Sequence, residues 1–260
     1  MMSIPIFFEI LSNNWHVIGL FFMISVLYSS VGFGGGSSYL AVLAFTGIAY
    51  LQIRSTSLLC NIMVVTGNVF FFYKQGLYNW KKIAPLVLFS IPFAFIGGYL
   101  KINQTFFFIL LGCVLLFAAI TMWISKKIVS TENSAQNLST RKNASYGSVI
   151  GFTSGMVGIG GGIFLAPLLH LTKWDVPKKI AATASLFILV NSVSGLIGQY
   201  FNPAFSINWE FTSVLLATVF IGGQIGNRLS NKFFTAVQLK KATAILIAFV
   251  SVKILWSYLF

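Results

Sequence analysis

Long apolar runs separated by short polar segments make up most of the chain. Six runs approach the ~20 apolar residues that a membrane-spanning helix needs. They occupy residues 55–73, 83–100, 106–124, 180–201, 211–226 and 242–256. The other four runs form two pairs, 10–31 with 37–49 and 144–156 with 163–171, and a glycine cluster divides each pair. This pattern predicts an all-α polytopic membrane protein.

One segment near the middle of the chain is too polar to lie in a membrane. Residues 126–143 read KKIVSTENSAQNLSTRKN, which is rich in serine and asparagine. We interpret this segment as an aqueous linker. It divides a single integral membrane domain into a first transmembrane repeat, residues 1–125, and a second, residues 144–260.

The two halves resemble each other in sequence. The matches, in chain order, are GFGGG (32–36) with GIGGG (158–162), Ser57 and Leu58 with Ser185 and Leu186, Gly67 with Gly195, and Trp80 with Trp209. The spacing between partners hardly changes along the chain. Glycine-rich membrane helices that merely look alike would not keep this register, so the sequence predicts an internal duplication.

Composition agrees with a membrane location. Apolar residues make up 57% of the chain and charged residues only 8%, against about 25% charged in an ordinary soluble domain. So few charges cannot cover a soluble globule, which excludes most soluble enzymes and disordered proteins. The net charge of +13 is expected of cytoplasmic loops in a membrane protein. It therefore indicates a lipid bilayer rather than nucleic acid as partner. No cofactor or metal site is predicted, because the two cysteines, Cys60 and Cys113, are too few for a metal cluster.

The basic residues also predict the topology, with the linker in the cytoplasm of a cell with an inner, or plasma, membrane. If the second glycine-split pair crossed the membrane once, the basic residues would divide almost equally between the two sides. If both pairs turn back, only Arg54, Lys101 and Lys253 of the 17 basic residues lie outside. The second arrangement is predicted, with both termini outside. Re-entrant hairpins and pairs of short full spans give the same count, so both stay open.

Each half is then a glycine-broken helix pair followed by three transmembrane helices. Because three is odd, the second half is inverted relative to the first. Two inverted repeats with interrupted helices are the architecture of many secondary transporters.

The glycine clusters are candidate binding elements. A helix follows each cluster directly, so its free N–H groups and positive dipole end would lie at membrane depth. Two such ends facing each other would bind an anion without a buried cation. The alternative is close helix packing. The candidate substrate-binding glycines are Gly34, Gly35, Gly36, Gly160, Gly161 and Gly162.

Polar residues near the clusters complete the candidate site, because buried polar groups in a membrane are costly unless they have partners. The substrate-binding candidates are Ser37, Ser38, Ser57, Asn61, Ser185 and Asn191. The further candidate cavity liners are Thr66, Asn68, Thr183, Ser192, Gln199 and Gln224. Arg54 is predicted on the outer side, where it either attracts anions to the mouth of the site or snorkels at the interface.

These motifs resemble those of the sulfite exporter TauE/SafE family of permeases. The resemblance rests on GFGGG at 32–36, GIGGGIFLAPLL at 158–169 and ATASL at 182–186. It covers essentially the whole chain. Pro167 stands where the family motif has its proline, whereas the first half has Ala41 at that place.

The resemblance implies a plasma-membrane permease for small sulfur-containing anions such as sulfite, sulfonates or sulfoacetate. We expect a non-enzymatic secondary transporter that acts as an exporter by alternating access, with a second copy of the chain as a candidate partner in a homodimer. Two alternatives stay open. One is an intramembrane hydrolase or transferase, which would need Ser37 with His16 or His170 as base. The other is a non-transporting assembly subunit.

Overall fold

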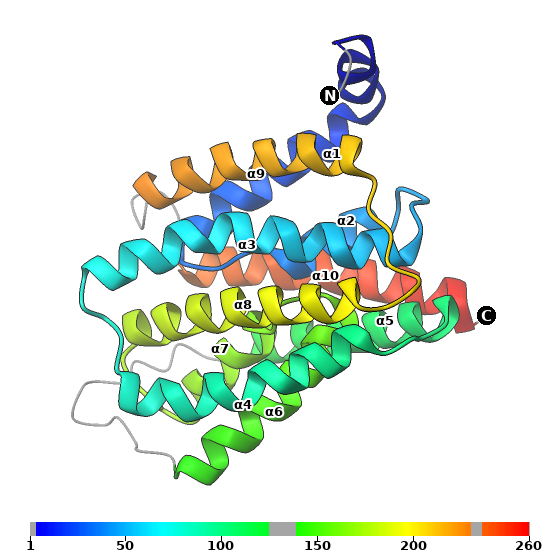
Figure 1. Cartoon of the computed structure of the whole chain (residues 1–260). Coiled ribbons are helices and arrows are strands. Elements are labelled where there is room, and N and C mark those ends of the chain that lie inside the picture. The colour runs from blue at the N-terminus through cyan, green and yellow to red at the C-terminus, as the bar shows by residue number, and fades with distance from the viewer. Residues whose placement is uncertain (1–3, 125–138, 230–235, 260) are drawn as a thin grey trace.

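The computed structural model describes residues 4–124, 139–229 and 236–259. These residues form ten helices, most of which lie side by side along one direction (Figure 1). The helices are α1 (Ile4–Ser30), α2 (Gly36–Leu43), α3 (Tyr50–Lys74), α4 (Trp80–Tyr99), α5 (Gln104–Ile124), α6 (Thr140–Val157), α7 (Gly162–Leu171), α8 (Pro177–Tyr200), α9 (Trp209–Leu229) and α10 (Ala236–Leu259). The predicted all-α fold is confirmed. Most of the predicted linker 126–143 lies outside the described residues, and its last four residues begin α6.

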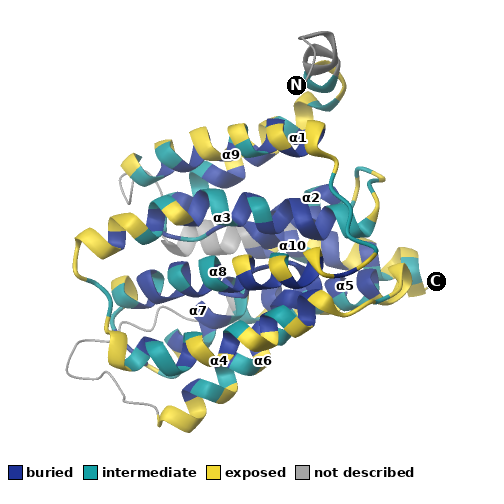
Figure 2. Cartoon of the chain, viewed as in Figure 1, coloured by how far each residue is buried: buried dark blue, intermediate teal, exposed yellow. Residues whose placement is uncertain are grey.

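Five helices in the described part of the chain are long and apolar enough to cross a membrane: Ile10–Ser30, Tyr50–Lys74, Trp80–Tyr99, Gln104–Thr121 and Pro177–Tyr200. The predicted span 211–226 forms α9, which has 21 residues but also carries Glu210 and Arg228 and is not among the five. Exposed residues lie along the outer faces of the helices (Figure 2). Many of them are large and apolar, and Leu88, Phe117 and Phe249 are all more than half exposed. Such a surface suits lipid rather than water, so the chain is a multi-pass membrane protein.

Both glycine-split pairs are hairpins. In each, a long helix is followed by a glycine loop and a short helix that turns back toward the end of the bundle from which the pair started (Figure 1). α2 has 8 residues and α7 has 10. At 1.5 Å per residue these helices are only about 12–15 Å long, half of the ~30 Å hydrocarbon core. The structure therefore favours hairpins over pairs of short full spans.

Contacts between loops define the two ends of the bundle. At one end, Lys82 Nζ lies 3.5 Å from Asp175 Oδ2 and donates a hydrogen bond to the Trp174 carbonyl. At the other end, the Tyr50 hydroxyl donates to the Ile102 carbonyl. The first end also holds Lys81, Lys178 and Lys179, next to the start of α4 and α8, whereas Lys101 and Lys253 lie at the second. The basic residues are thus separated as the hairpin topology requires. Which end faces the cytoplasm stays a prediction.

Glycines allow two helix pairs to pack unusually closely. On α6, a Cβ atom at Gly147, Gly151 or Gly155 would lie within 2.6 Å of a carbonyl oxygen of α4. On α9, a Cβ atom at Gly226 would lie 2.3 Å from the carbonyl oxygen of Val26 in α1. For these glycines, which lie outside the two clusters, close packing is the role that the structure shows.

Helix contacts recur in matched sets. α4 packs against α6 as α9 packs against α1, and α4 packs against α8 as α9 packs against α3. These four pairs, and the pairs α3–α8 and α5–α10, all join a helix of the first half to a helix of the second, so the two halves are intertwined. A duplicated chain with two-fold related halves would give this pattern. The inverted repeat itself stays a prediction.

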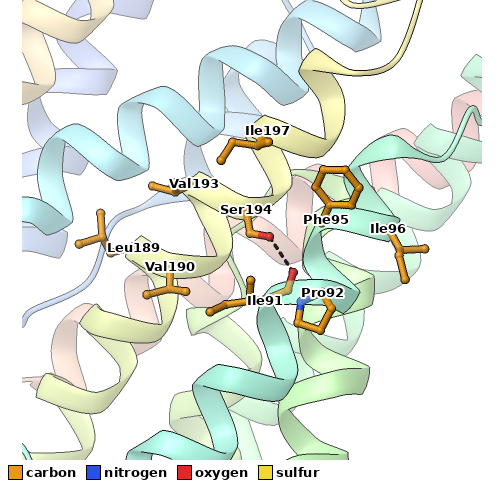
Figure 3. Close-up of a pocket in the computed structure, with 9 residues that line it drawn as sticks. All are labelled: Ile91, Pro92, Phe95, Ile96, Leu189, Val190, Val193, Ser194 and Ile197. Carbon is orange, nitrogen blue, oxygen red and sulfur yellow. Dashed lines mark hydrogen bonds between the residues drawn. The ribbon is translucent and has the colours of Figure 1, made fainter.

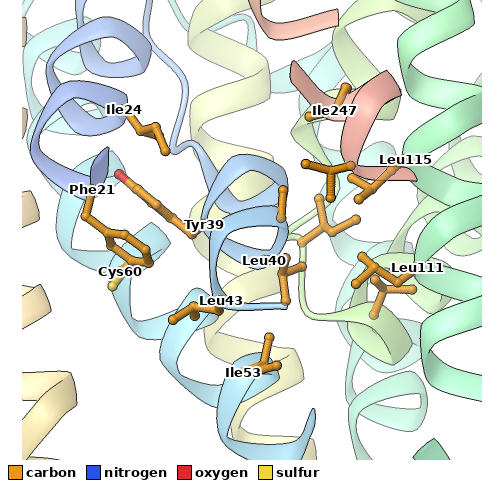
Figure 4. Close-up of a cluster of buried hydrophobic side chains, with 14 of the residues drawn as sticks. Phe21, Ile24, Tyr39, Leu40, Leu43, Ile53, Cys60, Leu111, Leu115 and Ile247 are labelled. Carbon is orange, nitrogen blue, oxygen red and sulfur yellow. The ribbon is translucent and has the colours of Figure 1, made fainter. Parts of the chain in front are cut away.

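A buried apolar cluster holds α2 inside the bundle. Tyr39 and Leu40 of α2 pack among side chains of α1, α3, α5 and α10 (Figure 4). The Tyr39 ring stacks on Phe21 of α1, with 4.6 Å between ring centroids. This packing fixes the first turn of α2, and with it the glycine loop that precedes the helix.

Candidate functional site

The two glycine loops meet in the interior of the bundle, between α3 and α8. A Cβ atom at Gly36 would lie 2.6 Å from the carbonyl oxygen of Ile159 in the other loop. Residues 34–38 and 154–162 are buried throughout. The loops contact Asn61, near the middle of α3, and Ile188, near the middle of α8. The structure thus brings the two predicted glycine clusters together at mid-depth.

Left-handed backbone at equivalent glycines shapes both loops. Gly35 has φ +88° and Gly161 has φ +84°, and each directly precedes the first residue of a short helix. Residues with a side chain rarely adopt this conformation, whereas glycine does so at little cost. The same local geometry therefore starts α2 and α7.

Each loop presents a run of backbone N–H groups that make no hydrogen bond within the described structure. In the first hairpin these belong to residues 34–37, and the next donor is the Ser38 N–H, which bonds the Gly35 carbonyl at 2.9 Å. In the second they belong to residues 160–163, and the Phe164 N–H bonds the Gly161 carbonyl at 3.2 Å. Unpaired buried N–H groups are rare and costly. Two such sets in adjoining loops, each at the positive end of a helix dipole, are suited to an anion.

Asn61 joins the two loops. Its side chain is fully buried, and its Nδ2 atom donates a 2.8 Å hydrogen bond to the Ile159 carbonyl. Its Oδ1 atom lies over Gly34, 2.4 Å from where a Cβ atom would stand, and has no hydrogen-bond partner. Asn61 therefore places one polar atom on the second loop and leaves another free at the first.

Ser192 faces the second loop from α8. Its hydroxyl oxygen is buried without a partner and lies 2.6 Å from the position of a Cβ atom at Gly160. Ser192 was predicted as a cavity liner, and its neighbour Asn191 was predicted to bind the substrate. Its Nδ2 atom donates to Ser90 Oγ at 3.0 Å and to the Phe187 carbonyl at 2.8 Å, so it faces α4. Successive helix residues point about 100° apart, and the amide was the more conspicuous of the two in the sequence.

The predicted serines lie next to the first glycine loop, on α2, α3 and α8. The Ser57 hydroxyl donates to the Gly36 carbonyl at 3.1 Å, and the Ser185 hydroxyl donates to the Gly32 carbonyl. Ser38 Oγ lies 2.8 Å from the Tyr28 hydroxyl, and Ser37 is buried in the first turn of α2. Ser57 thus supports the first loop from its own half, whereas Ser185 supports the same loop from the other half.

Arg54 lies near the start of α3, at the same end of the bundle as Lys101, but its surroundings differ from those predicted. Its side chain is 1% exposed, so it neither forms an open mouth nor snorkels to the interface. Its Nη2 atom lies 3.3–3.4 Å from the carbonyl oxygens of Gly97, Gly98 and Gly155. These carbonyls belong to the last turns of α4 and α6, whose dipoles each present a negative end of about −0.5 charge. The two helix ends close over the start of α3 and bury the guanidinium.

An apolar groove of about 690 Å³ runs along α4 and α8 (Figure 3). Its lining includes Pro92, Phe95 and Val193. The single polar side chain in the lining, Ser194, donates to the Ile91 carbonyl at 2.6 Å. No residue of either glycine loop lines this groove, so it is separate from the candidate site.

A helical bundle with a lipid-suited surface and two glycine-loop hairpins defines a multi-pass membrane protein built like a permease. Residues 17–254 match the model of the family described as sulfite exporter TauE/SafE. The chain belongs to this family, and the resemblance noted in its motifs is confirmed.

Its relatives carry transporter names. A probable membrane transporter protein of Sinorhizobium fredii, y4hK, is 31% identical over 91% of this chain and 96% of its own length. The probable membrane transporter protein MJ0441 of Methanocaldococcus jannaschii is 28% identical over 75% of this chain and 76% of its own length. YunE of Bacillus subtilis, another probable membrane transporter protein, is 24% identical over 80% and 85%. No solved structure matches the chain. The protein is accordingly a membrane transporter.

Proposed function

We propose that this transporter carries a small oxyanion held where the two glycine loops meet. The proposal rests on two runs of unbonded N–H groups, residues 34–37 and 160–163. They lie in two loops that meet in the interior of the bundle, and all of these residues except the half-buried Ile163 are buried. Such groups need an acceptor, and an anion with several oxygens supplies it. No buried lysine or arginine is needed, because the helix dipoles provide the positive potential.

The family description supports a sulfur-containing substrate. Sulfite, sulfonates and sulfoacetate each carry a compact group of oxygens of the size that two opposed loop ends can hold. We place the protein in the plasma membrane with residues 126–143 in the cytoplasm. Export is then favourable, because each negative charge that leaves a cell gains about 2.3 kcal/mol per 100 mV of inside-negative potential.

We propose that transport works by alternating access, and the same arrangement supports this. The loops belong to different halves of the chain and meet through few polar contacts, among them the Asn61–Ile159 hydrogen bond. The matched contacts define two groups of helices, α1 with α3 and α9, and α6 with α8 and α4, and each group takes helices from both halves. Rocking of one group against the other would open the site first to one end of the bundle and then to the other. The matched helix contacts supply two similar bodies for such a motion.

Flux through proteoliposomes tests the proposal. Gly161→Leu puts a side chain at φ +84°, where its Cβ atom would lie 2.8 Å from Phe187. Gly47→Leu is the matched control, because Gly47 also has positive φ, +71°, but has nothing within 4 Å. We expect sulfite and sulfoacetate flux to be lost in Gly161→Leu and kept in Gly47→Leu, with both proteins monodisperse in detergent. Equal flux in the two variants would reject the loop site.

The enzyme alternative finds less support. Ser37 is buried in the first turn of α2, whereas His16, one candidate base, is exposed on α1. A nucleophile needs its base within hydrogen-bond reach. Turnover of a substrate in detergent, where no second compartment exists, would favour that alternative over transport.

A further inference from the structure

One buried atom in the site has the wrong polarity for a simple anion. The loops offer N–H donors, yet Asn61 Oδ1, a hydrogen-bond acceptor, lies among them over Gly34. It is buried and has no partner in the described structure. An acceptor left unpaired in a buried site costs free energy, just as an unpaired donor does.

The orientation of the Asn61 amide is determined by its neighbour. The Ile159 carbonyl oxygen, 2.8 Å away, can only accept a hydrogen bond. The atom that faces it must therefore be the NH₂ group of the amide, and the oxygen must point to the first loop. Turning the amide over would place two oxygens against each other.

We infer that the anion bound between the loops carries a hydrogen-bond donor of its own, an O–H or N–H group, and gives it to Asn61 Oδ1. This inference rests on the proposed function and narrows its substrate class. The charged oxygens of the anion accept from the backbone N–H groups. An anion with oxygens on every side would instead place a lone pair against Asn61 Oδ1. A site built to accept a hydrogen bond from a substrate O–H discriminates strongly against analogues that lack the O–H group. The class that fits includes the singly protonated monoanion of a dibasic oxyacid.

Two probes of the same shape and charge isolate this donor. At about pH 5, below the second pKa of about 6 typical of a phosphoryl group, methylphosphonate is a monoanion with one O–H. Methanesulfonate is a monoanion without any. Dissociation constants come from ligand-dependent thermal shifts of the full chain in detergent, and counterflow in proteoliposomes measures transport. We expect the wild-type protein to bind methylphosphonate about 10- to 100-fold more tightly.

Variants locate the acceptor. Asn61→Ala is expected to bind the two probes equally. Ser192→Ala should weaken both by the same factor, because a hydroxyl can donate to either anion. Ser194→Ala is the matched control, since Ser194 lies two residues further along α8 and bonds the Ile91 carbonyl in the separate groove. It should change neither constant.

The outcomes separate the two proposals. Equal binding of both probes by the wild-type protein, lost in Gly161→Leu, would overturn the inference and leave the anion site standing. Loss of the preference in Ser192→Ala instead of Asn61→Ala would also overturn it, by moving the acceptor to Ser192. If the wild-type protein neither binds nor transports either probe, both the proposed function and the inference fail. The wild-type comparison needs no variant to fold.

Discussion

Replacing Gly36 by alanine tests directly whether contact between the loops supports transport. The φ of Gly36 is not positive, so alanine brings no backbone strain at this position. Its Cβ atom, however, would lie 2.2 Å from Asn61 Nδ2 and 2.6 Å from the Ile159 carbonyl oxygen. Contacts of a Cβ atom below 3.0 Å essentially never occur, so the second loop must move away.

The loss of stability in Gly36→Ala has two sources. Overpacking of a tight interior costs about 1–3 kcal/mol. Displacing Asn61 also breaks its hydrogen bond to Ile159, which contributes about 1 kcal/mol. We therefore expect Gly36→Ala to lose about 2–4 kcal/mol of stability. Sulfite flux should fall at least tenfold, because about 1.4 kcal/mol of lost anion binding already corresponds to that factor.

Thermal unfolding in detergent and proteoliposome flux measure the two effects. Gly19→Ala in α1 is the control, because a Cβ atom there has nothing within 4 Å. Removing a mid-helix glycine should stabilise that variant by about 0.5–1 kcal/mol and leave flux unchanged. If Gly36→Ala unfolds and transports like the wild type, then Gly36 does not touch the second loop and the anion site is not where the two loops meet.

Three further substitutions test the burial of Arg54, the packing of α4 on α6, and the orientation of the bundle in the membrane. Arg54→Met leaves carbonyls at the ends of α4 and α6 without their donor and should lower stability by about 1–3 kcal/mol. Arg54→Lys should recover part of the lost stability in thermal unfolding. Equal stability of the Met and Lys variants and the wild type would contradict the contacts of Arg54 with these carbonyls. Gly147→Ala puts a Cβ atom 2.1 Å from the Leu86 carbonyl oxygen and should cost about 1–3 kcal/mol in the same assay; an unchanged melting temperature would mean that α4 and α6 are further apart. In a cysteine-free background, Lys101→Cys should react with an impermeant maleimide in intact cells, and Lys178→Cys should react only after permeabilisation. The reverse pattern would overturn the assignment of residues 126–143 and the Lys178 end of the bundle to the cytoplasm.

The candidate site was only partly predictable. Both glycine clusters, Ser57, Asn61 and Ser185 were found from the sequence, because polar and glycine residues are conspicuous inside apolar spans. Their partners were not. Asn61 bonds Ile159, far along the chain in the other half, and no local pattern indicates that contact. The burial of Arg54 was missed for the same reason, since the helix ends that bury it come from α4 and α6.

By itself, the sequence determined the helices, the two breaks and the separation of basic residues. These depend on local properties: the length of an apolar run, the freedom of glycine to adopt positive φ, and the preference of lysine and arginine for one side of a membrane. Only the tertiary structure decided that the loops touch, that Ser192 rather than Asn191 faces them, and that Asn61 Oδ1 has no partner. Pairing of a buried polar atom depends on residues that are distant in the chain, so it becomes visible only when the helices are packed together.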